Sequence, residues 1–254
     1  MILWQRVERE SAMKDLQKKT CRYEFPSKVR YSEIDHRGTM TLPALINYFQ
    51  DCSTFHSEEI GCGMDTLKES KKAWVLAYWQ IIVDRYPTLC ETITVGTFST
   101  GIKAMFGNRN FYMKDEEGNQ IACANSIWVY MDLEKGRPAR VTKEQADAYG
   151  MEAPLDMPYE DRKIEAPDHY EPQESFPVRK YHIDTNEHVN NCQYVQMALE
   201  TLSRDFVVKQ VRVDYKKSAV LGDFIYPYVA KEEGRTVVNL CDETGSTYAL
   251  VELK

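Results

Sequence analysis

Hydrophobic and polar positions follow two periods along the chain, and each change of period separates an expected helix from expected strands. Residues 42–60 carry apolar side chains three and four positions apart, which is typical of a helix with one buried face. Thr41 precedes this segment as an N-cap, Pro43 is tolerated in the first turn, and Gly61 follows the end. The pattern therefore predicts one long amphipathic helix.

The segments around this helix have the composition of strands, with many aromatic and branched residues. The expected strands of the first half are 23–31, 74–86, 91–99, 106–114 and 120–131. One helix with a run of antiparallel strands indicates an α+β fold in which the sheet curls around the helix.

The second half of the chain repeats this pattern. In the first half the pair Val29-Arg30 precedes the pair Ile34-Asp35. In the second half Val178-Arg179 precedes Ile183-Asp184 at the same spacing. A helix is expected after each motif, in the second half with its buried face at Val195, Ala198, Leu199, Leu202 and Phe206. Strands are then expected at 224–231, 236–241 and 246–254. Two such units in one chain should pack as an internal pseudo-dimer.

The repeat divides the chain into four parts. Residues 1–22 form a charged N-terminal tail without an apolar core of the kind a secretory signal has, and Met13 is an alternative start. Residues 23–150 form the first unit and 176–254 the second. Between them, 151–175 is a proline-punctuated linker that we expect to lie over the surface.

Three polar side chains occupy alternate positions just before the second helix: Asp184, Asn186 and His188. In extended chain, alternate side chains leave the same side, so the three are expected to face one space. Each alone is typical of a turn or a structural site, but together they place a carboxylate, an amide and an imidazole beside a helix N-terminus. The backbone N–H groups there favour anions and suit chemistry in which a carbonyl oxygen becomes negative. The expected donors are Val189, Asn190 and Asn191.

Only the second half carries this set, because the first half has Asp35, Arg37 and Thr39 at the corresponding positions. We therefore expect the first half to be a non-catalytic, substrate-holding unit. Cys192 is a rival nucleophile, since it follows a His and an Asn, but its place inside the helix favours a buried packing role.

Composition narrows the function. The 254 residues are 43% hydrophobic and 28% charged, with a net charge of −7. No apolar run approaches the roughly 20 residues that span a bilayer, and no long basic run suits nucleic acid. The seven cysteines are scattered, without a metal-ligand spacing, which favours a reducing, cytoplasmic setting. We expect no cofactor, no nucleic-acid partner and no integral membrane association.

The run Asp184-x-Asn186-x-His188-Val189-Asn190-Asn191-x-x-Tyr194 resembles the signature of the acyl-acyl carrier protein thioesterases, which have the hotdog fold. Further resemblance lies at 74–87 and at 214–223, and the similarity extends from about residue 23 to the C-terminus. It implies a tandem (double) hotdog, a fatty acyl thioester on an acidic carrier protein, and release of free fatty acid in fatty acid biosynthesis. It also implies active-site roles for Asp184, Asn186 and His188.

One position departs from the family. Ser218 and Ala219 stand where plant members have a Glu-Cys pair, so a catalytic thiol or carboxylate at that position is excluded. Glu200, on the helix after His188, is the substitute candidate for a fourth catalytic residue, beside the alternative of a structural glutamate. In the expected mechanism Asp184 activates a water, while His188 and Asn186 polarise the thioester. Direct attack by the carboxylate remains the alternative.

Two further sets are binding candidates. Large or flexible side chains of the first half are candidates for the acyl channel, beside the simpler role of core: Ile46, Phe49, Trp79, Met105 and Phe106. Basic residues near the exit of the second helix are candidates to steer an acidic carrier protein, beside the role of a solvated strand edge: Lys209, Arg212, Lys216 and Lys217. The tandem repeat allows a monomer or a homodimer. The alternative functions are an acyl-CoA thioesterase and a non-catalytic acyl-binding protein.

Overall fold

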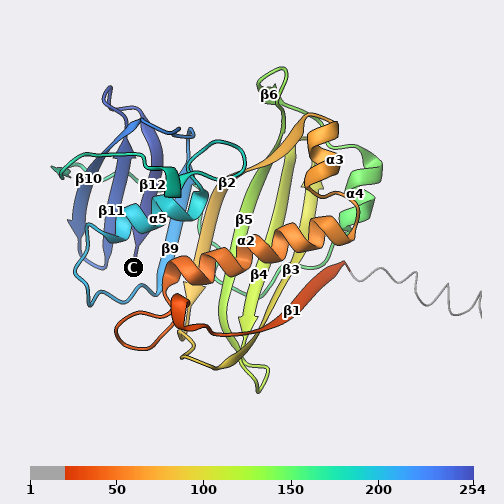
Figure 1. Ribbon diagram of the computed structural model, residues 1–254, viewed down its shortest axis with the longest axis horizontal. Coiled ribbons are helices and arrows are strands. Elements are labelled where there is room, and N and C mark those ends of the chain that lie inside the picture. Colours follow the sequence, from red (N-terminus) through yellow and green to blue (C-terminus); the bar gives the residue numbers. More distant parts are fainter. Residues whose placement is uncertain (1–20) are drawn as a thin grey trace, which may run out of the picture.

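The computed structural model describes residues 21–254; the tail predicted for residues 1–22, with Met13, lies almost wholly outside the described residues. The described chain builds one sheet with two helices lying against the same face (Figure 1). The strand order is β1-β3-β4-β5-β2-β9-β12-β11-β10-β7. This is the predicted α+β arrangement in which each half is an antiparallel sheet covered by a helix, and the two half-sheets join into one.

The first half follows the hydrophobic periodicity closely. Its long helix is α2 (Leu42–Glu59), whose first turn is capped by the Thr41 hydroxyl, 3.2 Å from the amide of Ala44. Its strands are β1 (Arg22–Lys28), β2 (Lys72–Val83), β3 (Thr92–Lys103), β4 (Phe106–Lys114), β5 (Gln120–Asp132) and the short β6 (Arg137–Pro138). The sequence pattern missed three short elements, namely β6 and the helices η1 (Tyr31–Glu33) and α3 (Met64–Glu69).

The second half repeats this order with shorter elements. After α4 (Lys143–Tyr149) come β7 (Glu171–Pro172), β8 (Phe176–Pro177), η2 (Lys180–His182) and α5 (Asn191–Leu199). The strands are β9 (Gln210–Tyr215), β10 (Phe224–Glu232), β11 (Arg235–Cys241) and β12 (Thr247–Leu253). No helix between residues 21 and 254 is long and apolar enough to cross a bilayer.

Helix α5 is shorter than predicted. It ends at Leu199, and the Thr201 hydroxyl donates to the carbonyl of Ala198 at 2.7 Å. Leu202 and Phe206, which the periodicity assigned to this helix, lie in the following loop. Leu202 still packs against the core, which explains why the spacing continues past the helix, whereas Phe206 is exposed.

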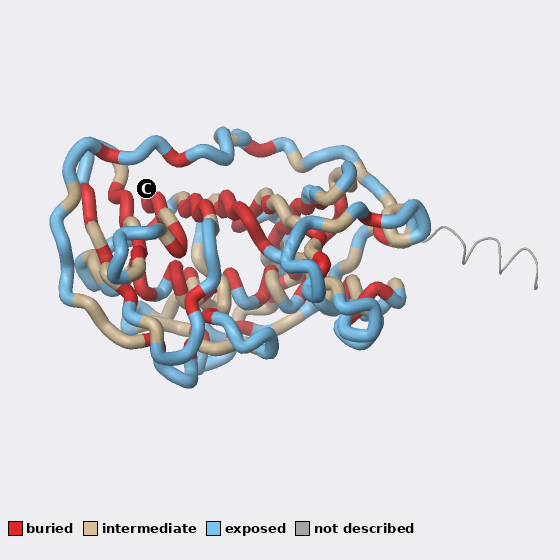
Figure 2. Tube along the Cα trace, turned by 90° about the horizontal axis from the view of Figure 1, so that it is seen from above, coloured by how far each residue is buried: buried red, intermediate tan, exposed pale blue. Residues whose placement is uncertain are grey.

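The two halves share a single sheet because β2 and β9 pair antiparallel, from Tyr78 with Asp214 to Ile82 with Gln210. Val83 and Val213 are corresponding residues of the sequence repeat, and Ile81 pairs with Val211, two residues before each of them. The join is therefore close to twofold symmetric. Seen from above, buried residues run continuously through the middle of the molecule (Figure 2).

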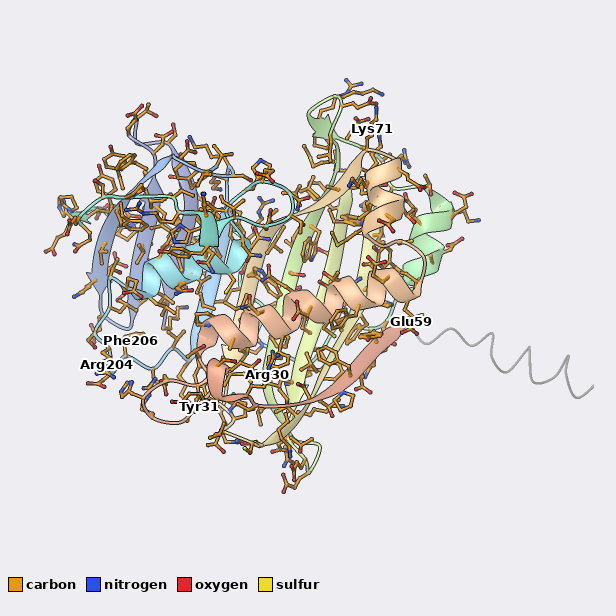
Figure 3. The ribbon with its side chains drawn as sticks, viewed as in Figure 1. Arg30, Tyr31, Glu59, Lys71, Arg204 and Phe206 are labelled. Carbon is orange, nitrogen blue, oxygen red and sulfur yellow. The ribbon has the colours of Figure 1, made fainter. Side chains whose placement is uncertain are left out.

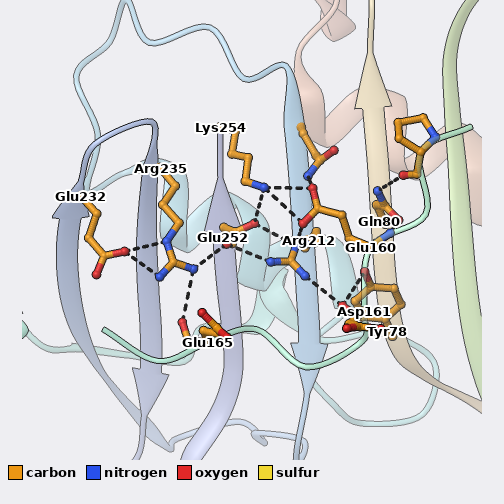
Figure 4. A network of polar contacts seen from close by, with 12 residues as sticks. Tyr78, Gln80, Glu160, Asp161, Glu165, Arg212, Glu232, Arg235, Glu252 and Lys254 are labelled. Carbon is orange, nitrogen blue, oxygen red and sulfur yellow. Dashed lines mark hydrogen bonds and ion pairs between the residues drawn. The ribbon is translucent and has the colours of Figure 1, made fainter. Parts of the chain in front are cut away.

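The segment between the halves lies on the sheet face opposite the helices. Gln80 on β2 donates to the carbonyl of Pro158 at 2.7 Å and accepts from the amide of Glu160 at 3.0 Å. Farther along, Arg212 pairs with Glu252 and donates to the carbonyl of Asp161 at 2.9 Å (Figure 4). These contacts hold the segment against both halves, so it is packed although it has little regular structure.

Candidate active site

The Asp184–His188 segment is a tight turn, so the prediction that it is extended chain is wrong. An isolated bridge joins Ile183 to Val189 on either side, and the amide of Asp184 donates to the carbonyl of His188 at 2.8 Å. The side chains of Asn186 and His188 are exposed at the surface of the turn. Their alternate spacing therefore does not place them on one face of a strand, and it is their backbone amides that approach Asp184.

The carboxylate of Asp184 organises this turn with one oxygen. Its Oδ1 accepts from the amide of Asn186 at 2.7 Å and from the amide of His188 at 3.4 Å. No hydrogen bond from a described residue reaches Oδ2. The half-buried carboxylate is thus oriented by the backbone while one oxygen stays open to a substrate or a water.

The backbone of Glu187 is part of this geometry. Its φ of 60° lies in the left-handed region, which side-chain-bearing residues adopt at a cost of about 1 kcal/mol or more. Gly38, at the same place in the first-half turn, has a φ of 76°. The second half therefore keeps a glutamate in a conformation for which the first half uses glycine.

The first half has the same turn with its carboxylate saturated. The Arg37 guanidinium bonds Asp35 Oδ2 through Nε at 2.9 Å and Nη2 at 2.7 Å, and its amide bonds Oδ1 at 2.9 Å. Burial alone raises the pKa of Asp35, but the bonds from Arg37 outweigh it and hold this pKa below its usual value. Asp35 therefore has no open oxygen with which to accept a proton.

Backbone donors beside the catalytic turn are fewer than predicted. The amide of Val189 donates to the carbonyl of Ala219 at 2.9 Å, and the amide of Asn190 to the carbonyl of His182 at 2.8 Å. These bonds correct the expectation that both serve an oxyanion. Only Asn191 of the three, the first residue of α5, has an amide without an acceptor among the described residues, because Asn190 caps the next amide.

The first half reaches this site through α2. The side-chain amide of Gln50 lies 3.4 Å from Asn190 Oδ1, and the thiol of Cys192 lies 3.3 Å from the carbonyl oxygen of Pro43. Sequence reasoning missed Gln50, because no local pattern signals a contact between residues so far apart. Cys192 is fully buried, and burial raises its pKa to about 12, which favours the packing role over that of a nucleophile.

Ser218 and Ala219 lie in the loop next to the turn. Ala219 is buried, its amide donates to the Tyr194 hydroxyl at 2.8 Å, and its carbonyl holds Val189. Ser218 is exposed. The loop thus supports the turn through its backbone and offers no acid or thiol there.

Glu200 is not part of this constellation, which corrects the prediction that it completes the catalytic set. It follows α5, and nine residues of helix separate it from Asn191 by about 13 Å. It instead lines a cavity of about 770 Å³ together with Asp35 and Arg37 of the first-half turn. Arg30 beside η1 and Arg204 and Phe206 in the loop after α5 border the same cavity (Figure 3).

The predicted acyl-binding residues divide into two groups. Ile46, Phe49 and Trp79 are fully buried between α2 and the sheet, where the Phe49 and Trp79 rings stack at 6.2 Å. Met105 lies in the hairpin turn between β3 and β4, and Phe106 begins β4 with 39% of its surface exposed. The structure therefore brings the first three together in the core and places the other two apart from them.

The predicted carrier-binding cations do not form one patch. Arg212 is buried beneath the linker in its pair with Glu252, so it cannot contact a carrier protein. Lys216 pairs with Asp214 at 2.5 Å, Lys217 pairs with Asp242, and Lys209 donates to a backbone carbonyl at 2.9 Å. Their charges are largely used within the protein.

The fold defines a tandem hotdog protein, and within residues 21–254 only the second-half turn leaves its aspartate with an open oxygen. The acyl-ACP thioesterase N-terminal domain matches residues 20–149, and the acyl-ACP thioesterase C-terminal domain matches residues 165–252. The chain belongs to the acyl-ACP thioesterase family.

Among curated relatives, it is 27% identical over 242 residues to an oleoyl-acyl carrier protein thioesterase of Arabidopsis thaliana, covering 86% of this chain and 66% of the relative. Over 250 residues it is 24% identical to an oleoyl-acyl carrier protein thioesterase of Coriandrum sativum, and this match covers 89% of this chain and 68% of the relative. The chain thus spans about two thirds of these plant relatives.

Solved structures share the fold. An acyl-ACP thioesterase from Bacteroides thetaiotaomicron superposes with a TM-score of 0.84 at 22% identity, covering 92% of this chain and 98% of that one. The 12:0-ACP thioesterase from Umbellularia californica superposes with a TM-score of 0.79 at 18% identity. The superposition covers 92% of this chain and 96% of that one.

Proposed function

We propose that this protein hydrolyses fatty acyl thioesters of acyl carrier protein, releasing free fatty acid during fatty acid biosynthesis. The observation that carries the proposal is the Asp184 carboxylate, held by two backbone amides on one oxygen and open on the other. The family and the names of its plant relatives support the acyl-carrier substrate.

In the proposed mechanism, a water hydrogen-bonded to Asp184 Oδ2 attacks the thioester carbonyl and gives its proton to the carboxylate. The exposed His188 and Asn186 side chains donate to the carbonyl oxygen or the departing sulfur, and the amide of Asn191 adds a donor at the start of α5. One such donor is worth about 3 kcal/mol in other enzymes. The thiolate leaves without prior protonation, because thiols are much stronger acids than alcohols. Attack by the carboxylate itself is the alternative route.

The sequence boundaries fit this assignment. We propose that 23–150 is the acyl-holding hotdog, 151–175 the linker and 176–254 the catalytic hotdog. The matched ranges 20–149 and 165–252 support the division. Because one chain contains both halves of the twofold join, we propose a monomer with a complete site, in the cytoplasm.

The deciding experiment measures fatty acid release from a panel of acyl-carrier proteins and from the same acyl groups on CoA. Faster release from the carrier protein supports the proposal, and faster release from CoA indicates an acyl-CoA thioesterase. Stoichiometric binding without release would instead identify a non-catalytic acyl-binding protein.

We further propose that Arg179 and Lys180 dock the carrier protein. Both are exposed, they lie at the start of η2 just before the catalytic turn, and neither forms an ion pair with a described residue. Reversing the charge of both should raise KM for the acidic carrier substrate and flatten its salt dependence, with kcat little changed. The same reversal at Lys216 and Lys217 is the matched comparison. An equal or larger effect there would move the docking surface to that loop.

A further inference from the structure

A row of buried side chains crosses the sheet face that α2 covers in the first half. Ser99 on β3 pairs with Arg109 on β4, Arg109 with Ser126 on β5, and Ser126 with Trp79 on β2. All four are buried, and His56 on α2 meets the row, with its Nδ1 2.9 Å from Arg109 Nη1. We call these five residues the Arg109 row.

The guanidinium of Arg109 has no counter-ion among the described residues. Its Nη1 donates to the hydroxyl of Thr97 at 3.1 Å, and its carbon lies 5.3 Å from the centre of the Tyr149 ring. Only 7% of the residue is exposed. A buried cation without a carboxylate is unfavourable, and cations in such places usually pair or bind an anion.

The contact with Arg109 sets the tautomer of His56. A guanidinium only donates, so His56 Nδ1 must accept and the ring proton must lie on Nε2. Burial, and then the nearby Arg109 charge, lower the pKa of His56 to about 3, so the ring is neutral. Nε2–H is therefore a buried donor, and it has no acceptor among the described residues.

The row has an excess of donors. The indole N–H of Trp79 and the hydroxyl of Ser99 are also buried without a partner in the described chain. Ser126 is satisfied, because it accepts from Trp128 at 2.8 Å and donates to the carbonyl of Arg109 at 3.1 Å. Ser99 lies on the strand next to Arg109 and His56 contacts Arg109, whereas Trp79 lies two strands away. The unpaired cation and the two nearer donors call for a group that accepts hydrogen bonds and carries negative charge.

We propose that the Arg109 row is a binding site for a carboxylate carried at the end of a long apolar chain. This inference rests on the proposed function, since the same half is proposed to hold the acyl group. The carboxylate has two sources: the far end of an acyl chain whose other end is the thioester, or a released fatty acid that enters head first.

The length of α2 fits the first source. Its first turn touches α5 at Pro43, beside the catalytic turn, and His56 lies 13 residues later, a distance of about 20 Å along the helix axis. An extended covalent chain advances about 1.2 Å per bond, so about sixteen bonds cover this distance. A thioester at Asp184 would thus place the far end of a long-chain acyl group at the row.

The experiment compares two carrier thioesters of equal chain length, one ending in a methyl group and one in a carboxylate. The measured quantity is the ratio of kcat/KM for the carboxylate-ended over the methyl-ended substrate. Wild type is expected to give a ratio above one, and Arg109→Met is expected to lower this ratio by about tenfold or more. The exposed Arg140→Met is the matched control and should keep the wild-type ratio.

If neither thioester is cleaved, the proposed function is contradicted but the proposed binding site is not. Ligand binding, measured by thermal shift, then tests the site. A free long-chain dicarboxylic acid should then raise the Tm of wild type and of Arg140→Met, but not that of Arg109→Met. Replacing an unpaired buried charge by an apolar side chain is compatible with folding. A monocarboxylic fatty acid that gives the same Arg109-dependent shift identifies the released product as the ligand. A wild-type ratio below one with no Arg109-dependent shift, or a ratio unchanged in Arg109→Met, overturns the proposal.

Discussion

The two oxygens of Asp184 have different surroundings, and this difference separates it from Asp35. Both carboxylates close the same kind of turn, but Arg37 occupies the second oxygen of Asp35, whereas the second-half residue at that place is Asn186. Asn186 is uncharged and leaves Asp184 Oδ2 open. A single substitution thus accounts for the loss of an available base in the first half.

Asp184→Ala should lower kcat by about a thousandfold, because a general base typically contributes a hundredfold to ten-thousandfold. The matched control is Asp35→Ala, which removes the equivalent carboxylate and should retain most of the activity. Steady-state release of fatty acid measures both, with circular dichroism to verify folding. Comparable losses in the two variants would contradict the assignment of catalysis to one turn.

Residue identity alone was sufficient to select Asp184, Asn186 and His188, but not to describe their geometry. The alternate spacing suggested a strand, whereas an aspartate followed two residues later by an asparagine also suits a turn stabilised through its side chain. Glu200 was a reasonable candidate from its place on a helix. Only the direction and length of α5 show that it faces the other turn.

Among the helices and strands, the features that depend on residues close together in the sequence were predicted correctly. The predicted Thr41 cap is present. The end of α5 was predicted too late, because apolar spacing does not distinguish a helix from a loop that packs on the same core.

The catalytic turn itself should carry measurable strain at Glu187. Glu187→Gly is expected to raise the free energy of unfolding by up to about 1 kcal/mol, since glycine adopts a positive φ without steric cost. Urea denaturation measures this change. Gly38→Glu, which introduces the reverse exchange at the first-half turn, should destabilise by a similar amount; a stabilising effect there would contradict the argument.

At the scale of the whole molecule, the linker network ties the two halves together on the outer face of the sheet. Glu252 is 1% exposed and accepts from Arg212 at 2.8 and 2.9 Å and from Arg235 at 2.9 Å. Burial alone raises the pKa of Glu252, but these bonds outweigh it and lower the pKa to about 2.

A lowered folded-state pKa means that ionised Glu252 stabilises the fold above its unfolded pKa of about 4.3. We therefore expect this contribution to be lost as pH falls from about 4.5 to about 2, which thermal unfolding across that range measures. Glu252→Gln should cost about 3 kcal/mol at neutral pH, because it removes the buried charge that faces both Arg212 and Arg235 and leaves Arg212 only the more exposed Glu160, at 3.1 Å. The control Glu232→Gln alters a more exposed pair and should cost less than about 1 kcal/mol. Equal costs would show that burial of the pair is not what matters.

Features that depend on near neighbours are visible in the sequence: the two periodicities, the helix caps, the repeat, and the Asp-Asn-His signature before the second helix. Features that depend on residues far apart in the chain are visible only in the folded protein. The pairing of β2 with β9 made one sheet of two, the linker buried Arg212 against Glu252, and cross-strand pairing placed Arg109 beside His56. The sequence does not distinguish an arginine on a solvated edge from one in the core. The surroundings of the side chain are set by strands and helices that only the folded chain brings together.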